Sequence, residues 1–348
     1  MKAFQFSVIA LATLTMAACG GGGDSDNGGS TTPPTTNPPV AGYYPTQAIP
    51  GNYADSRARA FDSLNSFRTA CGFNALEQSP ELDIAAQGHA EYVEANSSVV
   101  HTQVTGQPGF TGVTAVDRAN AAGFQVLDYM EIVGAGITNS AATGSTGILT
   151  ETTNHVDIET LIKRQLGSVY HHMGAFAEMR YAGIGYQQGA NKGNLPAISY
   201  FDGFSVTLAN NTTTEVIDTS SAKGVRTFPC EGITGVLPVF TPETPNPMPR
   251  SLPDQNSTPY GHPIYVSSDI GTNIQVTTFS IVANGTPVTA TVLDEASDPN
   301  SRLASHQAYL VPDTELPPNV AVDVVIEGTV DGGNAFKKEF TFNTGTQL

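Results

Sequence analysis

Six prolines between Thr241 and Pro259 divide the chain into two parts with different hydrophobic patterns. Proline fixes its own backbone angle and has no N–H to donate, so neither a helix interior nor a central strand tolerates this density. Before the segment, apolar residues recur at helical spacing; after it, they alternate with polar residues. The pattern predicts two domains joined by a stiff linker over residues 241–259, and 348 residues are enough for two cores.

The C-terminal part, residues 260–348, is predicted to be a small all-β sandwich. Short runs that alternate apolar and polar residues are typical of strands buried on one face. Asn284-Gly285 stands between two such runs and favours a tight hairpin turn. The spacing of these runs fits a sandwich of six or seven strands. The expected strands cover residues 263–266, 274–282, 288–293, 308–311, 320–326 and 336–342.

The N-terminal part, residues 54–240, is predicted to be an α+β domain because helical and strand patterns mix along it. A first helix is expected over residues 55–70, ended by Gly72. Ser79-Pro80-Glu81 predicts the start of a second helix, with a capping residue, a proline in the first turn and an acid near the positive end of the dipole. Further expected elements are a short helix after Thr114 with a capping box to Asp117, a helix over 156–165, and strands over 181–186 and 197–204.

The first 51 residues are predicted to be a targeting segment and a tether. Lys2 precedes the apolar run Phe6 to Met16, which is shorter than the about 20 residues of a membrane-spanning helix. Ala17-Ala18-Cys19 resembles a bacterial lipobox, with an ordinary secretory signal as the alternative. Residues 1–18 are thus expected to be a signal peptide, Cys19 the lipidated first mature residue, and residues 19–51 a disordered tether. This predicts a lipid-anchored protein of the cell envelope, at the outer membrane or cell surface.

Charge and cysteine content narrow the partners and the compartment. A net charge of −17 with only 15 Lys plus Arg argues against nucleic acid, whose phosphates need a basic surface. Apart from Cys19, the chain has Cys71 and Cys230, an even pair that suggests one disulfide in an oxidising compartment. Two buried free thiols are the alternative. The chain-entropy model gives such a long-range disulfide roughly 4–5 kcal/mol of stabilisation.

Three motifs resemble a known family. They are the helix start Ser79-Pro-Glu-Leu82, the turn-rich stretch Pro108-Gly-Phe-Thr-Gly112, and Val116-Asp-Arg-Ala-Asn-Ala-Ala-Gly-Phe124. Together they resemble the bacterial branch of the CAP superfamily, the cysteine-rich secretory proteins, antigen 5 and pathogenesis-related proteins. The resemblance covers roughly residues 54–235 and implies an α-β-α sandwich with a cleft lined by two histidines and one or two acids.

The C-terminal sandwich carries a second resemblance. Tyr309-Leu-Val-Pro-Asp-Thr-Glu-Leu316, Gly328-Thr-Val-Asp-Gly332 and Phe340-Thr-Phe342 resemble bacterial Ig-like domains of surface proteins. Such domains usually act as spacers or adhesion modules.

The CAP resemblance implies three cleft residues in this chain. His101 takes the place of the first family histidine, and Glu131 that of the first acid, without its usual Gly and Asn neighbours. His171 takes the place of the second histidine, ahead of a Gly183-Ile-Gly-Tyr186 strand. The second acid is missing from its expected place near Ser168. Residues that could replace it are Glu151, Asp157 and Glu159.

Two imidazoles and a carboxylate can bind a divalent metal such as zinc, or hold a water for acid–base chemistry. His101, His171 and Glu131 are therefore a predicted metal set, while a nucleophile is missing because the chain has no Gly-x-Ser-x-Gly motif. Structural roles remain as alternatives: a loop histidine bonded to backbone, a helix-end histidine and a capping acid.

The remaining histidines and one charged pair are predicted to have no catalytic or binding role. His89 lies on an apolar helix stripe and is read as a satisfied core histidine. His155 is read as an exposed residue at a helix start, and His262 and His306 as exposed and without a role. Asp117 and Arg118 are expected to form a local ion pair or to fix a loop.

Three functions follow, in order of preference. The first is a non-enzymatic, membrane-tethered surface protein whose His/Glu cleft binds a divalent metal or a small ligand such as a lipid, with a surface protein as another expected partner. The second is a structural envelope lipoprotein with a degenerate cleft, and the third is a metal-assisted hydrolase.

Overall fold

The computed structural model describes residues 55–141, 155–189, 197–211 and 224–346. The predicted signal peptide, Cys19, the tether over residues 19–51 and Glu151 lie outside these ranges. No helix within the described ranges has both the length and the apolar character needed to cross a membrane.

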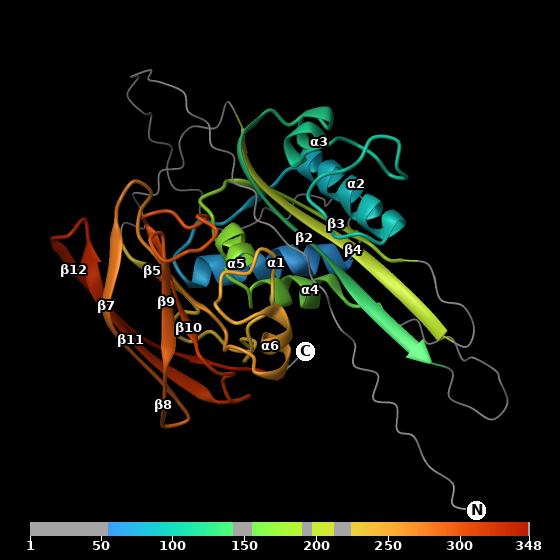
Figure 1. Ribbon diagram of the computed structural model, residues 1–348. Helices are drawn as coiled ribbons and strands as arrows, with labels where there is room; N and C mark the ends of the chain where they lie inside the picture. The colour runs from blue at the N-terminus through green and yellow to red at the C-terminus, as the bar shows by residue number, and fades with distance from the viewer. Residues whose placement is uncertain (1–54, 142–154, 190–196, 212–223, 347–348) are drawn as a thin grey trace, which may run out of the picture.

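The N-terminal domain is a four-stranded sheet with helices on both faces (Figure 1). The strand order is β1-β3-β4-β2, in which β4 pairs antiparallel with both β2 and β3, and β1 pairs parallel with β3. Helices α2 and α3 cover one face, and α1, α4 and α5 lie on the other. The strands are β1 (Glu77–Gln78), β2 (Val126–Ala141), β3 (Tyr181–Gln187) and β4 (Ala197–Asn211), and the helices are α1 (Asp55–Ala70), α2 (Pro80–Asn96), α3 (Ala115–Ala121), α4 (Ile158–Gln165) and α5 (Tyr170–Ala175).

The helix starts follow the local capping chemistry that the sequence predicts. The Ser79 hydroxyl accepts a hydrogen bond from the Leu82 N–H at the start of α2, with Pro80 in the first turn. Thr114 and Asp117 form a complete capping box at α3, because each side chain accepts from the other residue's backbone N–H. These caps fix where α2 and α3 begin, and both helices later carry or support site residues.

Three glycines allow α2 to lie directly on the sheet. A Cβ at Gly183 would overlap the backbone of Leu82, and one at Gly185 would overlap the backbone of Ala86. Gly203 on β4 has the same relation to Ala90. Any larger residue would push the helix off the strands. The Gly183-Ile-Gly-Tyr186 motif is thus a close-packing surface for α2.

The C-terminal domain is a sandwich of two four-stranded sheets, ordered β5-β6-β10-β9 and β12-β11-β7-β8. Asn284 and Gly285 have φ of 47° and 76° and form the tight turn between β7 and β8, which confirms the predicted hairpin. The strands are β5 (Arg226–Phe228), β6 (Ile264–Ser267), β7 (Ile274–Ala283), β8 (Thr286–Val288), β9 (Ala290–Asp294), β10 (Gln307–Pro312), β11 (Ala321–Val330) and β12 (Asn334–Asn343).

The boundary between the two parts differs from the prediction. Strand β5 precedes the proline-rich segment, yet it pairs antiparallel with β6 and so belongs to the C-terminal sandwich. Shortly after β5, Cys230 forms a disulfide with Cys71 at the end of α1, 159 positions away. The predicted disulfide is confirmed, and it ties the sandwich to the N-terminal domain.

The proline-rich segment, predicted to be a stiff linker, packs against both domains: Thr241 contacts Gly167, and Arg250 donates to the Asp313 carbonyl. It contains helix α6 (Leu252–Ser257), which tolerates Pro253 because the first helical turn needs no N–H from that residue. The Thr241 N–H donates to the Gly167 carbonyl at 2.8 Å. Glu243 is fully buried beside α5. The segment therefore joins the two domains as a packed element.

The two domains share one hydrophobic core. It runs from Phe61 and Phe176 of the N-terminal domain to Tyr265 and Phe342 of the sandwich. At the junction the Tyr309 hydroxyl donates to the Val169 carbonyl at 2.9 Å. The shared core and the disulfide make the two domains one packed body.

Candidate functional site

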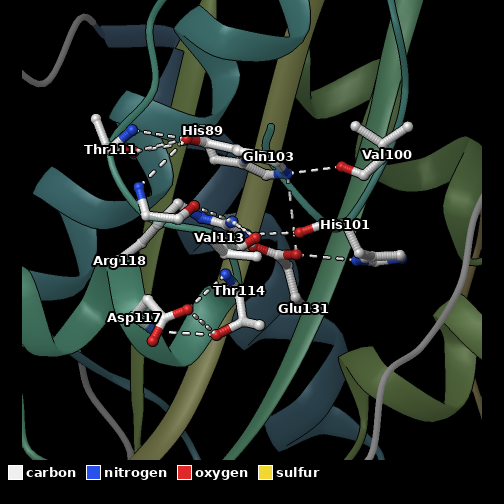
Figure 2. A network of polar contacts seen from close by, with 11 residues as sticks. His89, Val100, His101, Gln103, Thr111, Val113, Thr114, Asp117, Arg118 and Glu131 are labelled. Carbon is white, nitrogen blue, oxygen red and sulfur yellow. Dashed lines mark hydrogen bonds and ion pairs between the residues drawn. The ribbon is translucent and has the colours of Figure 1, made fainter. Parts of the chain in front are cut away.

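Glu131 lies at the centre of a buried polar cluster on the α2–α3 face of the sheet (Figure 2). Its carboxylate accepts a hydrogen bond from Arg118 Nη2 on Oε1 at 2.6 Å. His101 Nδ1 lies 2.9 Å from the other oxygen, Oε2. Both carboxylate oxygens are therefore engaged by basic side chains.

Three elements bring these side chains together. Glu131 lies in the middle of β2, Arg118 on α3, and His101 in the chain that follows α2. Arg118 also donates to the His101 carbonyl at 3.1 Å. Arg118 Nη1 donates to the Gly112 carbonyl at 3.4 Å. A Cβ at Gly112 would lie 2.9 Å from the backbone nitrogen of Arg118, so this loop position also needs a small residue. One guanidinium thus fixes the acid, the backbone of the histidine and the loop before α3.

A second layer of the cluster holds the turn-rich loop in place. His89 Nε2 donates to the Val100 carbonyl at 2.8 Å, which leaves Nδ1 to accept from Gln103 Nε2 at 3.0 Å. The Gln103 amide oxygen accepts from the Thr111 N–H at 2.7 Å. His89 is fully buried with both ring nitrogens satisfied, which confirms its reading as a core histidine.

The charges in the cluster are set by burial and by close neighbours. Burial alone would raise the pKa of Glu131, but His89, Arg118 and His101 outweigh it and lower that pKa to about 2. Burial lowers the pKa of His89 to about 4, so its ring is neutral near pH 7. Glu131 is therefore a carboxylate whose charge is balanced by Arg118.

His171 lies apart from this cluster. Met130 and Ile132, the neighbours of Glu131 along β2, face Gly174 of α5. Because side chains alternate along a strand, Glu131 points to the opposite face. His171 is buried in α5, where its Nδ1 lies 2.6 Å from Ser168 Oγ and 3.1 Å from Glu243 Oε2. The structure divides the predicted trio of His101, Glu131 and His171.

Glu243 is the acid that the sequence did not reveal. It also accepts hydrogen bonds from the N–H groups of Val169 and Tyr170, at 2.7 and 3.0 Å, at the start of α5. Its place in a segment read as a linker carried no signal for this role. The proposed substitutes lie elsewhere, since Asp157 pairs with Arg59 and Glu159 pairs with Lys163, each at 2.8 Å.

The predicted metal set is not assembled in this structure. Within the described ranges, no three His, Cys, Asp or Glu side chains are arranged so that they could hold a metal ion. Glu131 is paired with Arg118 at 2.6 Å, and the guanidinium already balances its charge. The His101 side chain, 21% exposed, is the part of the cluster that reaches solvent.

Several structural interpretations of other residues are corrected. Arg118 pairs with Glu131 and donates to the Gly112 carbonyl at 3.4 Å, while Asp117 caps α3. Of the two roles expected for Asp117 and Arg118, fixing a loop is therefore confirmed and the ion pair between them is not the main contact. His155 is half-buried, with its Nδ1 2.8 Å from a buried Asp202 carboxylate. His262 is buried and His306 half-buried, where both were predicted to be exposed, because the sandwich packs over them.

Comparison with known proteins identifies the N-terminal domain. Residues 61–195 match the model of CAP, the cysteine-rich secretory protein family. None of the curated proteins compared matches the chain. The protein therefore contains a CAP family domain, which confirms the resemblance read from the sequence motifs at the level of the family.

Proposed function

We propose that the protein is a non-enzymatic surface module, secreted and tethered to a membrane, whose CAP domain binds a small ligand at His101. The observation that carries this proposal is the Glu131 carboxylate, which has Arg118 on one oxygen and His101 on the other. Each oxygen of this acid already pairs with a basic side chain, and the buried guanidinium of Arg118 balances its charge, so the acid is poorly suited to act as a general base or as a metal ligand. The His101 imidazole is the member of the cluster that reaches solvent, where a ligand can contact it. Of the two ligand types predicted, this favours a small molecule, such as a lipid headgroup, over a metal.

The test is native mass spectrometry of the protein isolated from an oxidising compartment. The parent is compared with His101→Ala and with His306→Ala, a control in the C-terminal sandwich. We expect a bound small molecule in the parent and the control that is lost from His101→Ala. A parent free of any adduct overturns ligand binding. Ester, peptide or phosphodiester turnover that disappears in His101→Ala would instead support the hydrolase.

A structural envelope lipoprotein is the second candidate. The shared core and the Cys71–Cys230 disulfide favour it, because they join the domains into one rigid body suited to spacing or scaffolding. In this proposal the C-terminal sandwich is an Ig-like spacer. This candidate is preferred if no ligand is found but loss of the protein changes the integrity of the envelope.

Membrane attachment is proposed through Cys19, in the Ala17-Ala18-Cys19 motif. Mass spectrometry of the mature N-terminal peptide tests it. We expect acyl chains on Cys19 and release of Cys19→Ser from the membrane fraction. An unmodified terminus cleaved at another position would contradict lipidation and support an ordinary secretory signal.

A further inference from the structure

A pocket of about 410 Å³ lies at the start of α2, on the same face of the sheet as the Glu131 cluster. Five elements meet there: the end of β1, the start of α2, the chain between α3 and β2, the start of β3 and the end of β4. The Glu131 cluster contacts α2 at His89, roughly 14 Å along the helix from Pro80, and shares no residue with the pocket. The main lining side chains are Gln78, Glu81, Phe124, Gln125, Tyr181 and Asn211.

The apolar wall of the pocket is fixed by core packing. Phe124 is buried, and its ring meets the Tyr181 ring edge to face with centroids 5.6 Å apart. Both rings pack with Leu82 and Ala119 in a small hydrophobic cluster between the sheet and helices α2 and α3. The exposed Pro80 adds a further apolar surface. The pocket therefore presents a preformed wall against which C–H groups of a ligand can pack.

The polar wall has unused hydrogen-bonding capacity. Within the described ranges, neither the Gln125 amide nor the Tyr181 hydroxyl makes a hydrogen bond. Glu81 accepts from the Ser79 hydroxyl at 2.6 Å through Oε2, which leaves Oε1 for a further donor. An amide and a phenol both donate and accept, whereas a carboxylate only accepts. A ligand that satisfies all three groups must therefore offer donors as well as acceptors.

The charges around the pocket disfavour ionic ligands. Among the described residues that line it there is no Lys, Arg or His, and Glu81 already occupies the positive end of the α2 dipole, so an anion is disfavoured. No group of His, Cys, Asp or Glu in the described part of the chain could hold a metal ion. Arg180 Cζ lies 5.3 Å from the Tyr181 ring centroid, so this ring already faces one cation and an organic ammonium group is disfavoured. The ligand class that remains is neutral.

We propose that this pocket binds a neutral saccharide. Sugar hydroxyls both donate and accept, as Gln125 and Tyr181 do, and they can donate to Glu81. The C–H face of a sugar ring packs against the apolar wall of Pro80, Phe124 and Tyr181. The volume of about 410 Å³ lies within the range of small-molecule sites, roughly 300–1,000 Å³. An acyl chain would leave Gln125 and Glu81 without partners in the pocket, so a lipid tail fits poorly.

The site is tested by saturation-transfer NMR and calorimetric titration on the chain carrying Cys19→Ser, which removes the proposed lipid anchor. The probes are glucose, galactose, mannose, N-acetylglucosamine, maltose, cellobiose and chitobiose. Inorganic phosphate, choline and decanol represent the anionic, cationic and apolar ligand classes. The test variants are Gln125→Ala and Tyr181→Phe, and the matched control is Gln275→Ala, an exposed amide on β7 of the sandwich. Circular dichroism checks that each variant is folded.

We expect at least one sugar to bind the parent and Gln275→Ala with equal Kd. Binding should be at least about fivefold weaker in Gln125→Ala and in Tyr181→Phe, because each loses a hydrogen bond to the sugar. His101→Ala should keep this binding, so the result is independent of the ligand proposed at His101. The site is overturned if no sugar binds, or if the parent and both test variants bind equally. Tighter binding of phosphate, choline or decanol than of any sugar overturns the ligand class.

Discussion

Arg118 Nη2 lies 2.6 Å from Glu131 Oε1, and both side chains are 1% exposed. The acid that the family resemblance places in a cleft is thus bound by a buried guanidinium. A buried ion pair stabilises a fold only when its geometry and additional hydrogen bonds offset desolvation. Here Arg118 also bonds the His101 carbonyl, and His101 bonds the second carboxylate oxygen. The cluster is therefore a buried ion-pair network that joins α3, β2 and the chain after α2, and His101 is its one member that faces solvent.

Replacing Arg118 by methionine leaves Glu131 buried and without its cation. We expect the free energy of unfolding to fall by about 3–5 kcal/mol, measured by urea denaturation. The matched control is Arg59→Met, which removes an exposed pair with Asp157 and should cost less than about 1 kcal/mol. Adding Glu131→Leu to Arg118→Met should recover part of the loss. If Arg118→Met and Arg59→Met lowered the free energy of unfolding equally, the buried pair would not be important for stability.

Gly185→Ala tests the packing of α2 on the sheet. The added methyl overlaps the backbone of Ala86, which cannot move without displacing the helix. We expect a loss of at least about 1–3 kcal/mol or failure to fold, measured by thermal unfolding. Gly333→Ala is the control, since its only neighbour within 4.0 Å is the Asp331 carbonyl, at that limit. Similar melting temperatures for the two variants would contradict the packing role.

The parts of the fold that could be read from the sequence are those fixed by local chemistry. Ser79 and Pro80 have the capping and first-turn preferences of a helix start, and Asn284-Gly285 favours a tight turn through its own backbone preferences. Strand alternation predicted six of the eight sandwich strands to within a few residues, but not β5 or the short β8. The proline-rich segment misled because Pro253 stands in a first turn, where helices accept it.

Only the site residues that belong to the family motifs could be predicted from the sequence. His101 and Glu131 come together as the resemblance implied. Arg118 is part of the recognised motif, but the sequence offers its neighbour Asp117 as the obvious ion-pair partner. Glu131 becomes the partner because α3 packs close to β2 in the folded protein. Glu243 lies 72 positions after His171 in sequence number. Pairings at that distance depend on tertiary packing, so residue type and spacing alone could not show this one.

The disulfide between Cys71 and Cys230 should stabilise both domains together. It closes a long loop, and the shared core couples the two domains on either side of it. We expect Cys71→Ala with Cys230→Ala to lower the free energy of unfolding by about 2–5 kcal/mol. Calorimetry should show one transition before and after the change. Two separate transitions in the parent would contradict a single cooperative body.

Buried neutral histidines should make the protein sensitive to acid. Burial lowers the pKa of His89 to about 4 and that of His262 to about 3, against about 6.5 in the unfolded chain. Below pH 6.5 the unfolded chain therefore binds more protons than the folded one, and stability falls as the pH falls. Each such group contributes a slope of up to about 1.4 kcal/mol per pH unit. Urea unfolding between pH 7 and 5 measures this slope.

The contributions of these histidines and of Glu131 to the pH dependence of stability fall in different pH ranges. The pKa of Glu131 is lowered to about 2, so its contribution is present above about 4.5, the ordinary value, and is lost only as the pH falls toward 2. Between pH 6.5 and 5 the slope thus reports the histidines. His262→Phe should reduce it there, whereas Glu131→Gln should leave it nearly unchanged and act below pH 4.5. An unchanged slope in His262→Phe would show that this ring is already protonated or solvated in the folded protein.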